Sequence, residues 1–139
     1  MFMKEAENKV KVAIIGGGAS GVICAAEIIR QSNDIQITIF ERLPKLCKKI
    51  LVTGNGRCNF SNTDLSLSHF YGDYTFLKTI LTSVYSDSEN YFRSIGILPY
   101  YEDGRIYPRS QQSSSIRDAL LNQLNRKNIV IKTETQINN

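Results

Sequence analysis

Apolar and polar positions predict a strand, a helix and a second strand near the N-terminus of the chain. The unbroken apolar run 12–15 is typical of a strand that is covered on both faces. Residues 35–40 alternate in polarity up to Phe40, as a strand with one buried face does. Between them, apolar residues recur at helical spacing without a proline: Val22, Ala25, Ala26, Ile28 and Ile29. We therefore expect a βαβ unit over residues 10–41.

The middle of the chain, residues 63–110, is expected to be a helical excursion followed by a hairpin. Apolar spacing predicts a helix over 76–84. Ser86 to Glu89 has the form of a capping box, which predicts a short helix that Gly96 is placed to end.

Three further strands and one helix are expected toward the C-terminus. Short strands at 97–101 and 105–107 flank Glu102-Asp-Gly104, which is a hairpin turn signal. A helix is expected from Ser113 to about Lys127 because its apolar residues share one face. The alternating stretch 129–137 predicts a last strand, which we expect beside the strand at 35–40.

The first predicted strand runs directly into a G-x-G-x-x-G motif formed by Gly16, Gly18 and Gly21. The first glycine permits a tight turn, the second lets a pyrophosphate approach the backbone, and the third lets the helix pack closely on the strand. The phosphates would lie at a helix N-terminus, where free N–H groups and the helix dipole favour negative charge. Glu41 follows Gly21 by twenty residues, where a βαβ unit places an acid that binds an adenosine ribose.

A glycine-rich turn in some other α/β protein is the alternative interpretation. Here, however, strand, glycines, helix, strand and acid all occur in the expected order and spacing. The sequence therefore predicts an α/β, Rossmann-like FAD/NAD(P)-binding fold with a mostly parallel sheet. Because the chain stops two residues after its last predicted strand, we expect this sheet to be incomplete.

A second glycine-rich stretch, Gly54-Asn-Gly-Arg-Cys-Asn59, follows the βαβ unit. Two glycines around an asparagine indicate a positive φ, and such turns present successive N–H groups to an anion. Arg57 and Asn59 would add charged and amide hydrogen bonds. Alone, the stretch is more often a tight turn, but its position soon after the phosphate motif favours a ligand site.

The composition of the chain argues against several classes of function. A length of 139 residues suits one domain, and 42% hydrophobic residues without low-complexity tracts predict an ordered chain. The net charge of +4, without a Lys/Arg run, gives no reason to expect a nucleic-acid partner. Three cysteines without a C-x-x-C pair, and the sole histidine His69, indicate neither a disulfide framework nor a metal site. With no signal-peptide core and no membrane-length apolar stretch, a cytoplasmic protein is expected.

Three blocks carry a family resemblance: Val12–Gly21, the stretch Lys48–Asn62 with its TGNGRCN core, and Glu102–Ser110. With these blocks the chain resembles the BaiN-like family of NAD(P)/FAD-dependent oxidoreductases, the aminoacetone oxidase-like flavoproteins. The likeness spans essentially all of residues 1–139, which correspond to the first third of a full-length member. It implies a Rossmann-like FAD domain that is interrupted by an inserted domain and completed by a later segment.

The resemblance implies a cofactor site in two parts. The glycine motif would hold the FAD pyrophosphate, Glu41 the adenosine ribose, and Arg42 would lie near the adenine end. The cofactor-cleft loop, 42–62, would line the rest of the site. The cofactor-binding residues implied in this way are Gly16, Gly17, Gly18, Ala19, Ser20, Gly21, Glu41, Arg42, Lys49, Thr53, Gly54, Asn55, Gly56, Arg57, Cys58 and Asn59.

The cysteines are expected to be structural. Cys24 is interpreted as a small packing residue of the first helix. Cys47 and Cys58 lack a C-x-x-C partner, which favours buried or cleft-lining roles over redox ones. Cys47 is a departure from the family, which has glycine there, and a side chain would force a different turn.

The leading functional hypothesis is the FAD-binding portion of a flavin-dependent oxidoreductase that transfers electrons between NAD(P)H and a small-molecule substrate. No general base or nucleophile stands out, so catalytic residues stay unassigned, and this truncated chain alone is expected to be inactive. The alternatives are an NAD-binding dehydrogenase domain and a non-catalytic fragment or interaction module. No membrane partner is expected, whereas self-association or association with a missing C-terminal portion is.

Overall fold

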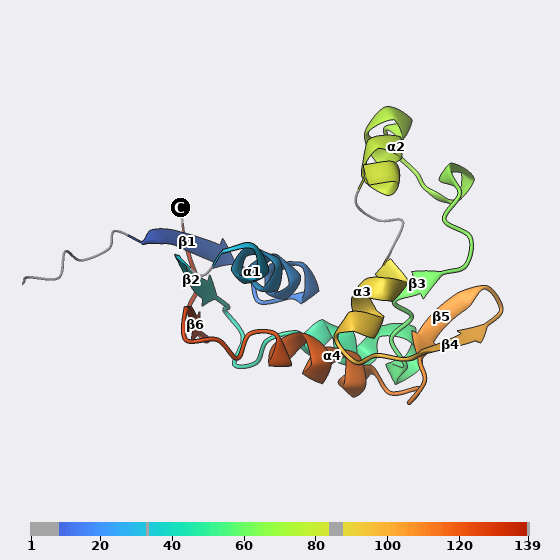
Figure 1. Cartoon of the computed structure of the whole chain (residues 1–139). Helices are drawn as coiled ribbons and strands as arrows, with labels where there is room; N and C mark the ends of the chain where they lie inside the picture. The colour runs from blue at the N-terminus through green and yellow to red at the C-terminus, as the bar shows by residue number, and fades with distance from the viewer. Residues whose placement is uncertain (1–8, 33, 84–87, 139) are drawn as a thin grey trace, which may run out of the picture. The chain divides into compact units, whose positions relative to one another are not determined.

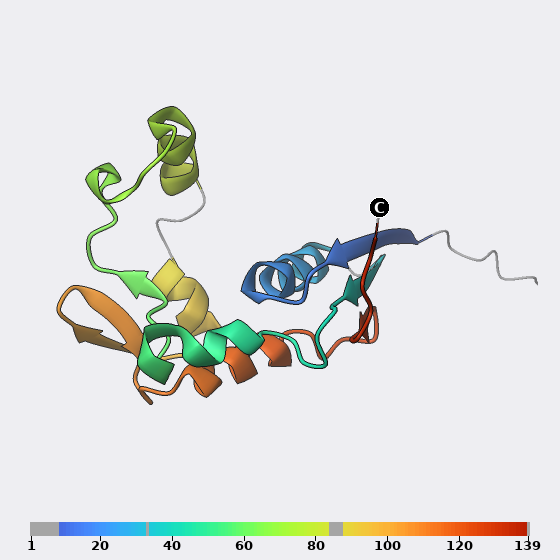
Figure 2. The same cartoon turned by 180° about the vertical axis from the view of Figure 1, so that it is seen from behind.

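Two groups of elements make up the computed structural model, which describes residues 9–32, 34–83 and 88–138 (Figures 1 and 2). The first unit comprises the described residues of Met1–Lys48 and Leu120–Asn139, and the second comprises those of Lys49–Ala119. Each unit has its own three-stranded sheet.

The sheet of the first unit is parallel, with the strand order β1-β2-β6. Its strands are β1, Val10–Ile15, β2, Ile35–Phe40, and β6, Ile129–Lys132. Ile15 at the end of β1 stands opposite Phe40 at the end of β2, so the carboxyl ends of these strands are level. The parallel pairing and the place of the last strand beside β2 confirm what the sequence predicts.

Helix α1, Ala19–Gln31, joins β1 to β2 and contacts both (Figure 1). Its spacing of apolar residues turns one face toward the sheet, and β2 lies at the centre of the sheet. Fully burying a valine or isoleucine side chain contributes about 1.5–3 kcal/mol, so this face holds the helix in place. The buried apolar residues of α1 and β2 are Val22, Ala25, Ile29, Ile37 and Ile39.

The last strand is shorter than its polarity pattern predicts. It stops at Lys132 rather than continuing to Ile137, because Glu134 adopts a φ of 52° and turns the chain. The N–H of Thr135 then donates to the carbonyl of Glu41 at 2.9 Å. The residues after β6 therefore cross to the carboxyl end of β2.

The sheet of the second unit is antiparallel, with the order β3-β5-β4. Its strands are β3, Ser61–Asn62, β4, Pro99–Glu102, and β5, Arg105–Pro108. The hairpin of β4 and β5 confirms the turn signal between them. Asp103 and Gly104 have φ values of 48° and 77°, which two-residue hairpin turns of type I′ require.

Short helices complete the described part of the second unit. The predicted helix at 76–84 corresponds to α2, and the capping box at 86–89 begins outside the described residues. The helices are η1, which comprises two short 3₁₀ segments within Lys48–Gly56 on either side of the non-helical Thr53, Gly54 and Asn55, then η2, Leu67–His69, α2, Tyr74–Ser83, and α3, Ser88–Ser94.

Helix α4, Ser113–Asn122, carries the chain from the second unit back to the first. Its first residue is buried, and the Ser113 hydroxyl donates to the carbonyl of Leu51 at 3.1 Å. The helix ends at Asn122, five residues before the predicted end at Lys127, because the following N–H groups bond three residues back. No described helix has the length and apolar character needed to cross a membrane.

Candidate functional site

The turn between β1 and α1 has a packed side and an open side. Gly16 adopts a φ of 104°, which residues with side chains rarely take, and its N–H donates to the Phe40 carbonyl at 2.8 Å. A Cβ atom on Gly21 would overlap the carbonyl oxygen of Gly16, so α1 can start this close to β1 only with glycine there. A Cβ atom on Gly18 would meet nothing within 4 Å. Gly18 therefore borders open space.

The N-terminus of α1 lies on the open side of this turn without a side-chain cap. Gly18 is the N-cap residue, with extended backbone and no side-chain hydrogen bond to the helix. No acidic residue occupies the first turn. Because the first N–H groups of an α-helix have no partner within the helix, and the dipole adds positive charge, this end can bind an anion.

Glu41 lies beside the same turn and is held by two backbone N–H groups. Its Oε2 atom accepts from Gly17 at 2.7 Å, and its Oε1 atom accepts from Leu43 at 2.8 Å. The hydrogen bond from Leu43, followed by that from Gly17, lowers the pKa of Glu41 below its ordinary value of 4.5, although partial burial opposes this. The carboxylate is therefore ionised at neutral pH and accepts hydrogen bonds without donating any.

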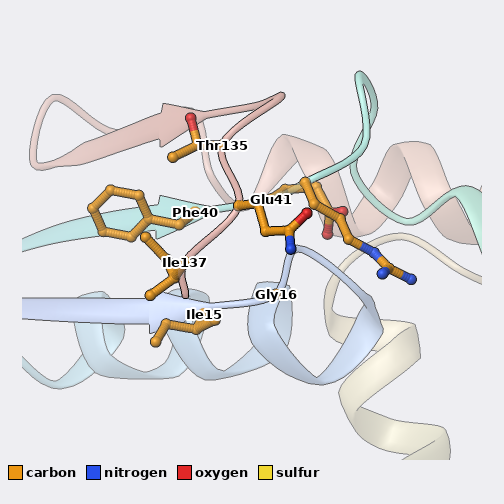
Figure 3. Close-up of a pocket in the computed structure, with 8 residues that line it drawn as sticks. Ile15, Gly16, Phe40, Glu41, Thr135 and Ile137 are labelled. Atoms are coloured by element: carbon orange, nitrogen blue, oxygen red, sulfur yellow. The ribbon is translucent and has the colours of Figure 1, made fainter. Parts of the chain in front are cut away.

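A pocket of about 270 Å³ opens beside Glu41, at the carboxyl ends of β1 and β2. Figure 3 shows the side chains of Ile15, Phe40 and Ile137 gathered on one side of it. Ile15 is 71% exposed and Ile137 is 46% exposed, so the fold leaves this apolar wall largely uncovered. The lining residues are Ile15, Gly16, Phe40, Glu41, Arg42, Thr135, Gln136 and Ile137.

Five of these lining residues were not predicted from the sequence, which indicated only Gly16, Glu41 and Arg42 of the set. The sequence does contain a signal that would have placed residues 135–137 near Glu41. Ligands of open α/β sheets bind outside the carboxyl ends of the strands, and the last strand was expected next to the strand of Glu41. The residues that follow it therefore meet Glu41 at one edge.

The rest of the predicted site residues lie in the second unit, in the loop 53–59 and at Lys49. Gly54, Asn55 and Gly56 have φ values of 53°, 56° and 80°, so the positive φ that the sequence indicates is present. The N–H of Cys58 donates to the carbonyl of Thr53 at 3.0 Å and closes the loop. The exposed predicted residues of this group are Lys49, Thr53, Gly54, Asn55 and Asn59.

Arg57 and Cys58 are engaged within the second unit. An Nη atom of Arg57 lies 2.8 Å from Oε2 and 3.2 Å from Oε1 of Glu102. This ion pair raises the pKa of Arg57 and lowers that of Glu102. The thiol of Cys58 is buried, and burial raises its pKa.

The other two cysteines differ from each other in exposure. Cys24 is exposed on α1, so the interpretation of Cys24 as a small packing residue of this helix is wrong. Cys47 is buried and adopts a φ of 55°, so the turn keeps a left-handed conformation although it carries a side chain. Within the described residues, no group of three or more His, Cys, Asp or Glu side chains could hold a metal ion.

The chain matches the family described as HI0933-like protein Rossmann domain over residues 10–139. It is 37% identical over 129 residues to 3-dehydro-bile acid delta(4,6)-reductase of Clostridium scindens, covering 91% of this chain and 32% of that protein. It is 39% identical over 57 residues to ribosomal RNA dihydrouridine synthase of Haemophilus influenzae, covering 41% of this chain and 14% of the relative.

The chain thus spans about a third of the length of the reductase. Among solved structures, THI4 of Thermovibrio ammonificans aligns with 90% of this chain and 38% of its own, at 11% identity and a TM-score of 0.47, too weak a likeness to support a conclusion. The family match covers both glycine-rich stretches and Glu41. The chain belongs to the HI0933-like Rossmann-domain family, which is the flavoprotein family that its sequence blocks resemble.

Proposed function

We propose that this chain holds the ADP half of FAD and is the FAD-binding portion of a flavin-dependent oxidoreductase. One juxtaposition in the first unit carries the proposal. The uncapped N-terminus of α1 and the ionised carboxylate of Glu41 flank the same glycine turn. A diphosphate is bound by the first kind of group and a ribose by the second. The family supports FAD as the dinucleotide.

The residues of the first unit fit such a group. Backbone N–H groups of residues 18–20 would bind the diphosphate, since no Cβ atom of Gly18 stands in the way. Glu41 would accept hydrogen bonds from ribose hydroxyls, because each carboxylate oxygen has a second acceptor position beside the one in use. Ile15, Phe40 and Ile137 would pack against the adenine ring.

The remaining predicted contacts rest on the family resemblance. Arg42 lines the pocket and would lie near the adenine end of the cofactor. Lys49 and the loop 53–59 would also contact the cofactor. Of that loop, Arg57 and Cys58 support it from within, and the exposed residues are those that would touch the cofactor.

The flavin ring of FAD supplies hydride transfer when bound, whereas this chain binds and orients the cofactor. NAD(P)H is proposed as the reductant. Two of the curated relatives are named as a 3-dehydro-bile acid delta(4,6)-reductase and a dihydrouridine synthase, and both names describe addition of hydrogen. We extend that class of reaction, reduction of a carbon–carbon double bond, to the protein of which this chain forms a part. The chain alone is expected to be inactive, because it corresponds to 32% of the reductase.

An NMR titration of the ¹⁵N-labelled chain with ADP, FAD and FMN tests the proposal. ADP and FAD should shift the amide signals of residues 18–20, and FMN, which has a single phosphate and no adenosine, should shift them less at the same concentration. We expect millimolar affinity, because the site in this chain contacts one end of FAD. Unmoved amides at millimolar ADP would contradict the assignment.

An NAD-binding dehydrogenase domain is the second candidate, and the position of Glu41 favours it equally. An acid there suits the ribose 2′-hydroxyl of NAD and opposes the 2′-phosphate of NADP. Thermal shifts with FAD, NAD and NADP separate the two candidates. We expect the largest shift with FAD and the smallest with NADP. A larger shift with NAD than with FAD would favour the dehydrogenase.

A further inference from the structure

Gly17 occupies a variable position of the G-x-G-x-x-G motif. Both its backbone N–H and its backbone carbonyl are hydrogen-bonded within the protein. Its N–H donates to Oε2 of Glu41 at 2.7 Å, across 24 residues of sequence. Its carbonyl accepts from the N–H of Cys47 at 2.8 Å. The N–H of Gly17 is therefore not available to an anionic ligand.

The space around Gly17 is also filled, unlike that around its two neighbours. Gly17 is buried, and a Cβ atom there would overlap the side chain of Leu46 and lie 3.2 Å from Cβ of Glu41. A Cβ atom on Gly16 or Gly18 would meet nothing within 4 Å. Of three consecutive glycines, the middle one faces the protein and the outer two face open space.

We propose that Glu41 is a positioning residue for the glycine turn, in addition to any contact with a ribose. Its carboxylate ties the N–H of Gly17 to the N–H of Leu43, and so holds the turn after β1 against the segment after β2. Cys47 fixes the other end of Gly17 from the same segment. That this turn faces a diphosphate rests on the proposed function, whereas the positioning itself does not.

Two physical points give this arrangement its effect. Hydrogen bonds to an ionised acceptor are about twice as strong as neutral ones, so the carboxylate holds the Gly17 peptide firmly. The next peptide N–H groups, at residues 18–20, then keep one orientation before any ligand arrives. A preorganised set of donors binds an anion without the cost of ordering the loop.

The variants Glu41→Asp and Glu41→Gln separate positioning from ribose binding. Aspartate keeps the charge but is one methylene too short to reach both N–H groups, and glutamine keeps the length but loses the charge. We expect hydrogen exchange of the Gly17 amide, followed by NMR, to be at least about tenfold faster in both variants than in the unchanged chain. The control is Glu27→Gln, which removes the same charge from the first unit, on the surface of α1.

The second measurement is the affinity of the chain for inorganic pyrophosphate, which has no ribose, compared with its affinity for ADP. If Glu41 positions the turn, Glu41→Asp weakens pyrophosphate binding about three- to tenfold, and it weakens ADP binding at least as much because the ribose contact is lost as well. If Glu41 only binds ribose, Glu41→Asp weakens ADP and spares pyrophosphate, and Gly17 exchange stays slow, which overturns the inference. Should the unchanged chain bind neither ligand, the proposed function fails, and Gly17 exchange alone still decides the positioning role.

Discussion

The guanidinium carbon of Arg57 lies 4.1 Å from the centre of the Tyr107 ring, which is close enough for a cation–π contact. The same side chain pairs with Glu102 through one Nη atom. Tyr107 is buried, and a Cβ atom on Gly54 would lie 3.4 Å from its ring. Arg57 thus fastens the 53–59 loop to the β4–β5 hairpin, which is a different task from binding an anion.

Replacing Arg57 with lysine should weaken this fastening although the charge is kept. Lysine has no planar group to stack on Tyr107, and without that stacking its ammonium is no longer held against Glu102. We expect Arg57→Lys and Glu102→Gln each to lower the urea midpoint of the chain, followed by circular dichroism. The double variant should fall little below either single one, because both remove one interaction.

Arg109→Lys is the matched control for that series. Arg109 lies in the same unit and its side chain is exposed, so this change should leave the midpoint in place. Fully additive effects of Arg57→Lys and Glu102→Gln would show that the two side chains act separately.

Gly17→Ala should destabilise the chain by about 1–3 kcal/mol, because the new methyl group overlaps the Leu46 side chain. Leu46→Ala alone should cost about 2–5 kcal/mol, since Leu46 is only 7% exposed. The double variant should be destabilised by at least about 0.5 kcal/mol less than the sum of the two single variants, because the cavity left by Leu46 accepts the new methyl group. Urea unfolding measures all three, and strict additivity would mean that the two residues do not meet.

Gly18→Ala and Gly21→Ala should separate ligand binding from stability. Gly18 has a φ of −74° and open surroundings, so alanine there should cost about 1 kcal/mol or less while its methyl group obstructs the diphosphate. Gly21→Ala forces a methyl group onto the Gly16 carbonyl and should cost about 1–3 kcal/mol or more. ADP titration and urea unfolding of both variants test this. Unchanged ADP binding by a folded Gly18→Ala chain would be the adverse result.

Acid should remove the contribution of Glu41 to stability. Its pKa is lowered in the folded chain, so the contribution is complete above the unfolded value of 4.5 and is lost as the pH falls through the lower folded pKa. The free energy of unfolding should therefore fall below pH 4.5, and less steeply in Glu41→Gln. Asp64, whose pKa is lowered to about 2, and Glu102, whose pKa is also lowered, lose stabilising interactions in acid as well. The relevant measurement is therefore the difference in free energy of unfolding between the unchanged chain and Glu41→Gln at each pH.

Local signals in the sequence predicted much of this fold. The apolar run before Gly16 and the alternating strand before Glu41 need only their immediate neighbours to be recognised, and both pair as expected. Asp103-Gly104 predicted the hairpin in the same way, because few residues tolerate the positive φ angles that this two-residue turn requires.

Other features depend on contacts between distant residues, which no local pattern encodes. The alternation through residue 137 favours a longer strand, but Glu134 turns back so that Thr135 can bond to Glu41. Likewise, the sequence indicates Gly17 only as one of the cofactor-binding residues, whereas the fold brings Cys47 and Glu41 to its two backbone groups.

The wall formed by Thr135, Gln136 and Ile137 has a consequence for biosynthesis. The other lining residues of the pocket lie between residues 15 and 42, and a ribosome releases them first. A nascent polypeptide therefore exposes the glycine turn and Glu41 long before it can close the pocket around them. A ligand that contacts the whole pocket can therefore bind only after β6 has docked on β2 and residues 135–137 have followed it.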